Sequence, residues 1–271
     1  MFNIVKQKIL KTKVVNEPYP HIIVKNFFPQ KIYNDLIKTL PDFNSLDDPS
    51  GKELLIQSKH VTKKTLMPDT KIFKELKKNN IFKSCDDVLK KIQPYIVQKF
   101  KDHIDENIHS KYLNNKIKYH MSLSFMRKGY LKSPHIDRRD HLIHALYYPV
   151  SEKSKSGDLL LYNTKKKPKI YDIFPRLIDL KIKKRIKVNP NFCIFSLNVP
   201  WAYHGVNKYN GNKDRKYFYV AYDFKIKNPG SKLKNRKKGF NDNSFWIVPA
   251  KVKSQSRRKK FLNEWNINLW N

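Results

Sequence analysis

The period of the hydrophobic pattern changes near residue 116. Before that point, apolar residues recur at helical spacing in segments 29–40, 70–79 and 81–109. Pro94 lies inside the last of these segments and is expected to kink or split that helix. After residue 116 the apolar residues alternate with polar ones or form short runs, as they do in strands. The pattern therefore predicts helices followed by a β-rich core.

Several short segments have the composition of strands. They are β-branched or aromatic and are bounded by turn-forming residues. A long insertion at 164–187 interrupts them and is expected to lie over the mouth of a barrel, with a short helix carrying its apolar centre. That apolar centre consists of Ile173, Phe174, Leu177 and Ile178. The predicted strands cover residues 13–28, 54–58, 116–129, 144–150, 156–163, 185–198 and 215–224.

The strand at 116–129 has two different faces. One face is apolar, and the other carries His120, Ser122 and Ser124. This polar face is compatible with the wall of a ligand pocket and also with a solvated surface. The apolar face consists of Tyr119, Met121, Leu123 and Phe125.

Two short motifs carry candidate metal ligands. The segment SPHIDRRD places His135 and Asp137 two residues apart, and WAYHGV supplies His204. In a strand, residues two apart point to the same side, so His135 and Asp137 can face one cavity. Two imidazoles and a carboxylate form the facial triad that holds Fe(II) and leaves positions open. A surface loop is the alternative for this motif, because further charged residues follow it.

The order of these motifs resembles the 2-oxoglutarate- and Fe(II)-dependent dioxygenases, in particular the prolyl-4-hydroxylase-like branch. The resemblance implies that His135, Asp137 and His204 ligate iron and form the catalytic centre. Arg215 follows His204 by eleven residues (215 − 204) and begins a strand. The resemblance implies that Arg215 pairs with the distal carboxylate of 2-oxoglutarate, as a guanidinium does well. It covers residues 116–226 best.

Two further residues are candidates at the cosubstrate end. Lys216 is the neighbour of Arg215, but strand alternation turns its side chain the opposite way. Tyr147 stands where related enzymes often have a tyrosine that donates its hydroxyl to 2-oxoglutarate. Packing in the core is an equal alternative for Tyr147, because a tyrosine has an apolar ring and a polar tip.

The resemblance also implies a fold and a domain division. The expected fold is α+β and mainly β, a double-stranded β-helix (jelly roll) supported by N-terminal helices. Residues 1–226 are expected to form the dioxygenase domain, with a helical and strand segment at 1–115 and the jelly-roll core at 116–226. Residues 227–271 are expected to be a basic linker and C-terminal extension, in which FWIVPA (245–250) docks back onto the domain.

The implied reaction consumes O2 and 2-oxoglutarate at Fe(II), releases succinate and CO2, and hydroxylates an unactivated C–H bond. Ascorbate is included as a candidate reductant. The substrate is a small molecule or a peptidyl side chain, and the sequence does not choose between them. Related halogenases have a small residue at the carboxylate position, so Asp137 favours hydroxylation. Related nucleobase demethylases carry a second arginine six residues after the first, where this chain has Ala221 (215 + 6).

The large positive charge of the chain suggests a second function that is not enzymatic. The chain has 271 residues with a net charge of +34, and its pI is about 10.0. A catalytically silent jelly roll that binds nucleic acid or another polyanion is therefore the second hypothesis. Abundant Lys, Asn and Ile also suggest an AT-rich genome, so only nonspecific polyanion adhesion is expected. Two cysteines and no apolar run of membrane-spanning length indicate a cytoplasmic protein, with its oligomeric state left open.

Overall fold

A computed structural model describes residues 1–46, 62–138, 141–152, 156–166, 175–225, 240–241, 245–247 and 250–251. The helices in these ranges are α1 (Phe2–Lys11), α2 (Gln30–Thr39), α3 (Lys71–Leu76), α4 (Asn80–Lys91), α5 (Gln93–Lys99) and α6 (Lys101–Asn107). The strands are β1 (His21–Val24), β2 (Lys63–Leu66), β3 (Ile117–Met126), β4 (Lys132–His135), β5 (Ile143–Val150), β6 (Leu159–Thr164), β7 (Leu180–Ile186), β8 (Phe192–Leu197), β9 (His204–Val206), β10 (Arg215–Phe224), β11 (Phe240–Asn241) and β12 (Ala250–Lys251).

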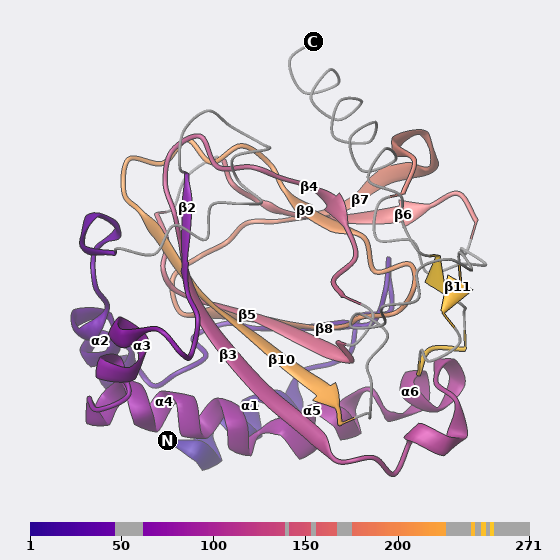
Figure 1. Cartoon of the computed structure of the whole chain (residues 1–271), viewed down its shortest axis with the longest axis horizontal. Coiled ribbons are helices and arrows are strands. Elements are labelled where there is room, and N and C mark those ends of the chain that lie inside the picture. Colours follow the sequence, from indigo (N-terminus) through magenta and orange to yellow (C-terminus); the bar gives the residue numbers. More distant parts are fainter. Residues whose placement is uncertain are drawn as a thin grey trace.

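Two antiparallel sheets face each other. The larger has the strand order β1-β8-β5-β10-β3-β2, and the smaller has the order β4-β9-β6-β7. The helices lie along the outer face of the larger sheet, and the smaller sheet lies on its other side (Figure 1). This arrangement is a jelly roll supported by N-terminal helices, as predicted.

The N-terminal helices share one hydrophobic core with the sheets. Leu36 of α2 and Phe82 of α4 are fully buried in the same apolar cluster as Phe218 of β10. The rings of Phe82 and Phe218 meet edge to face, with centroids 5.6 Å apart. Residues of the helical segment therefore stabilise the sheet that carries part of the candidate site.

The predicted helices are present with changed bounds. The segment 81–109 is split into α4, α5 and α6, and Pro94 lies in the first turn of α5, where a missing N–H costs nothing. The helix α1 is not among the predicted elements, although Val5 and Ile9 are fully buried at i,i+4 spacing. The strand predicted at 54–58 lies outside the described residues.

The prediction that residues 164–187 form an insertion between strands is wrong in part. Residues Leu180–Ile186 form β7, which pairs with β6 at the edge of the smaller sheet. Charged residues are common on edge strands, where they prevent pairing with other chains, and here they obscured the strand pattern. Leu177 begins a short 3-10 helix, whereas Ile173 and Phe174 lie outside the described residues.

The C-terminal segment reaches back to the core. Phe245 and Trp246 lie beyond the predicted boundary at residue 226, yet both side chains are buried. Trp246 forms an isolated β-bridge with Ile108, and the Phe245 ring packs on Phe224. In the parts of the chain that are described, no helix is both long and apolar enough to cross a lipid bilayer.

Candidate active site

The three predicted metal ligands converge between two neighbouring strands. β4 and β9 pair antiparallel, and His135 lies directly opposite His204 in the register. Asp137 follows two residues after the end of β4. One ligand atom from each of His135, Asp137 and His204 lies within 4.8 Å of the others. The structure therefore brings together residues that are far apart in the sequence.

Backbone contacts orient both imidazole rings. The Nδ1 of His135 donates to the carbonyl of Ser133 at 2.8 Å, and the Nδ1 of His204 donates to the carbonyl of Ala202 at 3.0 Å. A carbonyl oxygen only accepts, so Nδ1 carries the proton in each ring and Nε2 keeps a lone pair. Each Nε2 lies 3.7 Å from Asp137 Oδ1. Fixing the tautomer through the other ring nitrogen is how proteins prepare histidine for a metal.

A glycine permits this close pairing. A Cβ on Gly205 would lie 2.7 Å from the carbonyl oxygen of Lys132, which is closer than real Cβ atoms approach. The glycine after His204 therefore lets β9 pack against β4 at the level of the ligands.

The surroundings of Asp137 and His135 lower the pKa of both side chains. Burial raises the pKa of Asp137, but the nearby His144 and His204 outweigh burial, so the pKa lies well below its usual range. Burial and the neighbouring His204 lower the pKa of His135 well below its usual value. Asp137 thus offers an anionic oxygen, and His135 offers a neutral imidazole nitrogen. This donor set fits a divalent transition metal such as Fe(II).

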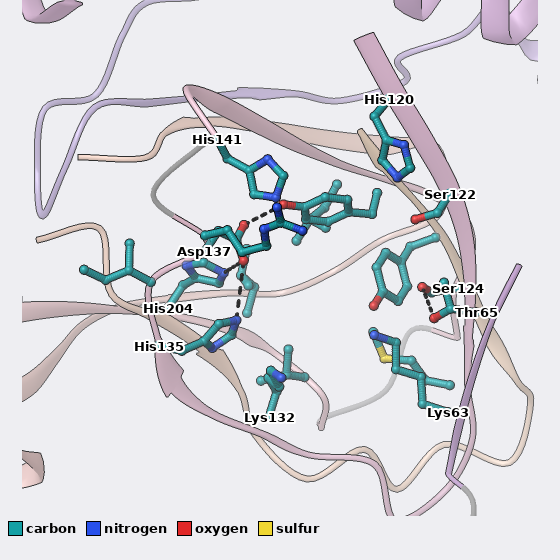
Figure 2. A pocket seen from close by; sticks show the side chains of 18 of the residues that line it. Lys63, Thr65, His120, Ser122, Ser124, Lys132, His135, Asp137, His141 and His204 are labelled. Carbon is teal, nitrogen blue, oxygen red and sulfur yellow. Dashed lines mark hydrogen bonds and ion pairs between the residues drawn. The ribbon is translucent and has the colours of Figure 1, made fainter. Parts of the chain in front are cut away.

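The triad opens onto a cavity of about 810 Å³. Figure 2 shows His135, Asp137 and His204 on one side of it, with the β3 and β2 side chains across from them. The predicted polar face of β3 lines this cavity, and the Ser124 hydroxyl is 2.9 Å from that of Thr65. The β3 residues in question are His120, Ser122 and Ser124.

Arg215 begins β10 and is 1% exposed. Its Nε donates to the Ser151 hydroxyl at 3.1 Å, and its other nitrogens donate to the carbonyls of Ser156 and Gly157. All of these acceptors are neutral, and no ion pair to Arg215 is found within 4.0 Å among the described residues. Burial lowers the pKa of Arg215. The nearby Asp158 charge opposes this effect, but no described carboxylate lies within 4.0 Å of Arg215, so the buried cation is suited to receive an anionic ligand.

Lys216 points away from this region. Its Nζ donates to the carbonyl of Leu40 at 3.2 Å and lies 3.4 Å from Asp42. Arg215 instead shares its strand face with Tyr217 and Tyr219, both of which line the cavity. The opposite orientations predicted for Arg215 and Lys216 are therefore observed, although Arg215 itself is not among the residues that line the cavity.

Of the two alternatives for Tyr147, the structure favours core packing over contact with the cosubstrate. Tyr147 lies on the helix-packed face of β5, its ring contacts Phe28, and its hydroxyl donates to Asn191 at 3.3 Å. Core packing is thus its role, because strand alternation turns its side chain away from the cavity. The next residue, Tyr148, lines the cavity, and its ring centroid is 5.9 Å from the Arg215 guanidinium. Counting alternate positions from His144, which contacts Asp137, would have selected Tyr148.

Two contacts to Asp137 are missing from the sequence-based site. The Tyr219 hydroxyl donates to Asp137 Oδ2 at 3.0 Å. The Nδ1 of His144 lies 3.2 Å from the same oxygen. Burial lowers the pKa of His144 to about 4, so this ring is neutral at neutral pH. The sequence shows only that each is a polar residue within an apolar strand, and their contact with Asp137 requires the two sheets to face each other.

No protein-family profile matches this chain, and no curated protein sequence matches it. Solved structures do match. The non-haem alpha-ketoglutarate-dependent epimerase SnoN from nogalamycin biosynthesis is 8% identical, with a TM-score of 0.50, over 82% of this chain and 83% of that one. This similarity concerns the fold, which is a double-stranded β-helix (jelly roll).

Other matching structures have lower TM-scores. A prolyl-4-hydroxylase from Pseudomonas putida is 10% identical, with a TM-score of 0.47, over 83% of this chain and 100% of that one. A prolyl hydroxylase from Trichoplax adhaerens, solved with a hypoxia-inducible-factor peptide fragment, is 14% identical, with a TM-score of 0.42, over 82% and 89%. At such identities the similarity concerns the fold, and the reaction has to be argued from the residues of the site.

Proposed function

We propose that this chain is an Fe(II)- and 2-oxoglutarate-dependent dioxygenase that hydroxylates an unactivated C–H bond. The observation that carries the proposal is the convergence of His135, Asp137 and His204 at the wall of a large cavity. Bound Fe(II) and 2-oxoglutarate supply the activation of O2 and the decarboxylation that yields succinate and CO2. The protein holds these groups, positions the substrate and limits access of water.

The roles of the ligands follow from their contacts. His135 and His204 present Nε2, because their Nδ1 atoms are held by backbone carbonyls. Asp137 presents Oδ1, which lies 3.7 Å from each of the two Nε2 atoms. In our proposal these three atoms hold the iron.

We assign the cosubstrate end to Arg215 and Tyr148. Arg215 is a buried guanidinium with neutral acceptors, and it can pair with the distal carboxylate of 2-oxoglutarate. Tyr148 lies beside it and lines the cavity, so its hydroxyl is placed to donate to the same carboxylate. Binding requires Arg215 to exchange some of its backbone contacts for the ligand.

The cavity leaves room for a substrate besides 2-oxoglutarate. Its volume of about 810 Å³ lies near the upper end of the range of small-molecule pockets, roughly 300–1,000 Å³. The substrate class in this proposal is a small molecule or a peptidyl side chain. A cytoplasmic location belongs to the proposal as well, because Cys85 and Cys193 are buried free thiols.

Succinate release tests the reaction, and anaerobic binding tests the site. The parent chain is expected to release succinate from 2-oxoglutarate when Fe(II), O2 and a suitable member of a substrate panel are present. Under anaerobic conditions, Fe(II) and 2-oxoglutarate together should give a metal-to-ligand charge-transfer absorbance. The double variant His135→Ala with Asp137→Ala should lose both signals.

A histidine outside the site provides the control. His109 is exposed, and His109→Ala should behave like the parent in both assays. Failure of the parent to bind 2-oxoglutarate at millimolar concentration with Fe(II) would reject the oxygenase proposal. It would favour the alternative, a silent scaffold that adheres to polyanions.

A further inference from the structure

The two oxygens of Asp137 have different surroundings. Oδ1 lies 3.7 Å from the Nε2 atoms of both triad histidines. Oδ2 accepts a hydrogen bond from the Tyr219 hydroxyl at 3.0 Å and lies 3.2 Å from His144 Nδ1. One oxygen is therefore directed toward the other ligands, and the other is engaged by the protein.

Asp137 itself lies outside the strand ladder. β4 ends at His135, so Asp137 lies beyond the last residue of this strand in the described structure. The side-chain amide of Asn198 fixes the loop after Asp137 by donating to the carbonyls of Arg138 and His141. Side-chain contacts from other strands contribute to the orientation of the Asp137 carboxylate.

Those contacts come from the facing sheet. Tyr219 belongs to β10 and His144 to β5, and these strands are neighbours in the larger sheet. In their register Tyr219 pairs with Leu146 and His144 pairs with Ala221, so the two side chains are diagonal neighbours on one face. Their rings are nearly parallel, with an interplanar angle of 9° and centroids 6.4 Å apart. A carboxylate on a loop is thus held by two rings on a rigid sheet.

We propose that Tyr219, supported by His144, keeps Asp137 a one-oxygen ligand of the metal by holding Oδ2 on the protein side. This inference rests on the proposed function and adds two positioning residues to it. A carboxylate that binds a metal through both oxygens occupies one more coordination position than a carboxylate that binds through one. Fixing Oδ2 would therefore preserve the open positions that 2-oxoglutarate and O2 require in a facial-triad site.

The two contacts differ in quality. The Tyr219 hydroxyl makes a hydrogen bond of ordinary length. His144 Nδ1 is buried and lies within ion-pair distance of Oδ2, but makes no aligned hydrogen bond within the described part of the chain. Tyr219 is accordingly the main anchor. His144 lies next to Oδ2 and limits the movement of the Asp137 carboxylate. The ring centroids of His144 and His204 are 4.9 Å apart.

The experiment uses the full chain with Co(II) in place of Fe(II), because Co(II) absorbance reports coordination number without turnover. Each variant is titrated anaerobically with Co(II) and then with 2-oxoglutarate. Tyr219→Phe is expected to change the Co(II) spectrum. Its 2-oxoglutarate affinity should fall about 10–100-fold, the range for removing an outer-shell partner, because Oδ2 is released to occupy a position near the metal.

Matched variants separate positioning from simple loss of structure. Tyr147→Phe removes a buried tyrosine hydroxyl from the same sheet but on its opposite face, and should match the parent spectrum and affinity. His144→Asn retains a nitrogen donor near the position of Nδ1 and should lie closer to the parent than His144→Leu does. Denaturant unfolding of each metal-free variant monitors the fold.

The outcomes distinguish this inference from the function on which it rests. A parent-like Co(II) spectrum and parent-like 2-oxoglutarate affinity in Tyr219→Phe would overturn the positioning role alone. Equal losses in Tyr219→Phe and Tyr147→Phe would overturn it too, by showing a general structural effect. If the parent takes up no more Co(II) than the His135→Ala, Asp137→Ala double variant, the proposed function fails and this inference fails with it.

Discussion

His135 and His204 face each other across the β4–β9 ladder, with ring centroids 4.4 Å apart. The pairing follows from antiparallel register, since directly opposite residues place their side chains on the same face of a sheet. Gly205 permits the close approach of the strands at this level. The candidate metal site is thus built on the backbone of the smaller sheet, which limits how far the two ligands can move apart.

Arg215→Ala should weaken 2-oxoglutarate binding by roughly 2–5 kcal/mol, because it removes one partner of a buried charge pair. Metal binding should change little, since Arg215 contacts none of the triad residues in the described structure. Anaerobic titration with 2-oxoglutarate in the presence of Fe(II) measures both quantities. Lys216→Ala is the control, because the Lys216 amine donates to the Leu40 carbonyl on the opposite face of β10 from Arg215. Loss of 2-oxoglutarate binding in Lys216→Ala alone would assign the role to Lys216.

Tyr148→Phe should reduce 2-oxoglutarate affinity by about 0.5–1.5 kcal/mol, the usual contribution of one hydrogen bond. Tyr147→Phe should leave that affinity unchanged, because the Tyr147 hydroxyl lies in the core near Asn191. Isothermal titration calorimetry with the Fe(II)-loaded, oxygen-free protein measures the difference. A larger effect in Tyr147→Phe than in Tyr148→Phe would contradict the observed strand alternation.

The metal-free protein should lose stability as the pH falls from about 6.5 toward 4. His21 is buried, donates from Nδ1 to the Tyr19 carbonyl, and lies 3.1 Å from the Lys184 amine. Burial and the Lys184 charge lower the pKa of His21 to about 4. An unfolded histidine has a pKa of about 6.5, so the unfolded state binds the proton first as the pH falls. Stability is full above about 6.5 and decreases by up to about 3 kcal/mol per such histidine.

Urea unfolding at several pH values tests this linkage. His21→Gln should give a shallower pH dependence than the parent between pH 6.5 and 4. Part of the dependence should remain, because the pKa of His144 is lowered in the same direction. His109→Gln, which changes an exposed histidine outside the core, serves as the control variant. Identical slopes in parent and His21→Gln would show that His21 is protonated in the folded state as readily as in the unfolded chain.

Trp246→Ala should destabilise the fold by about 3–5 kcal/mol, the cost of truncating a large buried aromatic side chain. Trp246 is 1% exposed and pairs with the backbone at Ile108, although it follows the predicted domain boundary at residue 226. Ile247 is 49% exposed, so Ile247→Ala should change stability by less than about 0.5 kcal/mol. Guanidinium denaturation measures both. Equal small effects would indicate that the domain ends before this segment.

Adhesion to nucleic acid should be nonspecific. Because its net charge is +34, the protein should bind two unrelated DNA duplexes with equal affinity at low salt. Phosphate contacts carry little sequence information. Binding should fall steeply and be largely lost near 200 mM salt, as counterion release predicts. A filter-binding salt series measures this. A strong preference for one sequence at that salt concentration would support the alternative function.

Local sequence patterns predicted the His135–Asp137 pair and much of the secondary structure, whereas His204 was added by the order of motifs that resembles the dioxygenases. Residues two apart on an extended segment share a side, which accounts for His135 and Asp137. The same rule correctly separated Arg215 from Lys216. The hydrophobic pattern did not predict the strand β7, because charged residues interrupt its apolar positions. Its lysines are tolerated because β7 lies at a sheet edge.

The sequence by itself determined which residue types are available and on which face of each strand they lie. It fixed the two-residue spacing of His135 and Asp137 and the polar face of β3. Only the tertiary structure decided which faces meet across the cavity. It placed Tyr147 in the core and Tyr148 beside Arg215, because the orientation of β5 depends on the helices that pack on one side of its sheet. It also brought Tyr219 to Asp137, 82 residues away, a contact that no local pattern encodes because it requires two separate sheets to face each other.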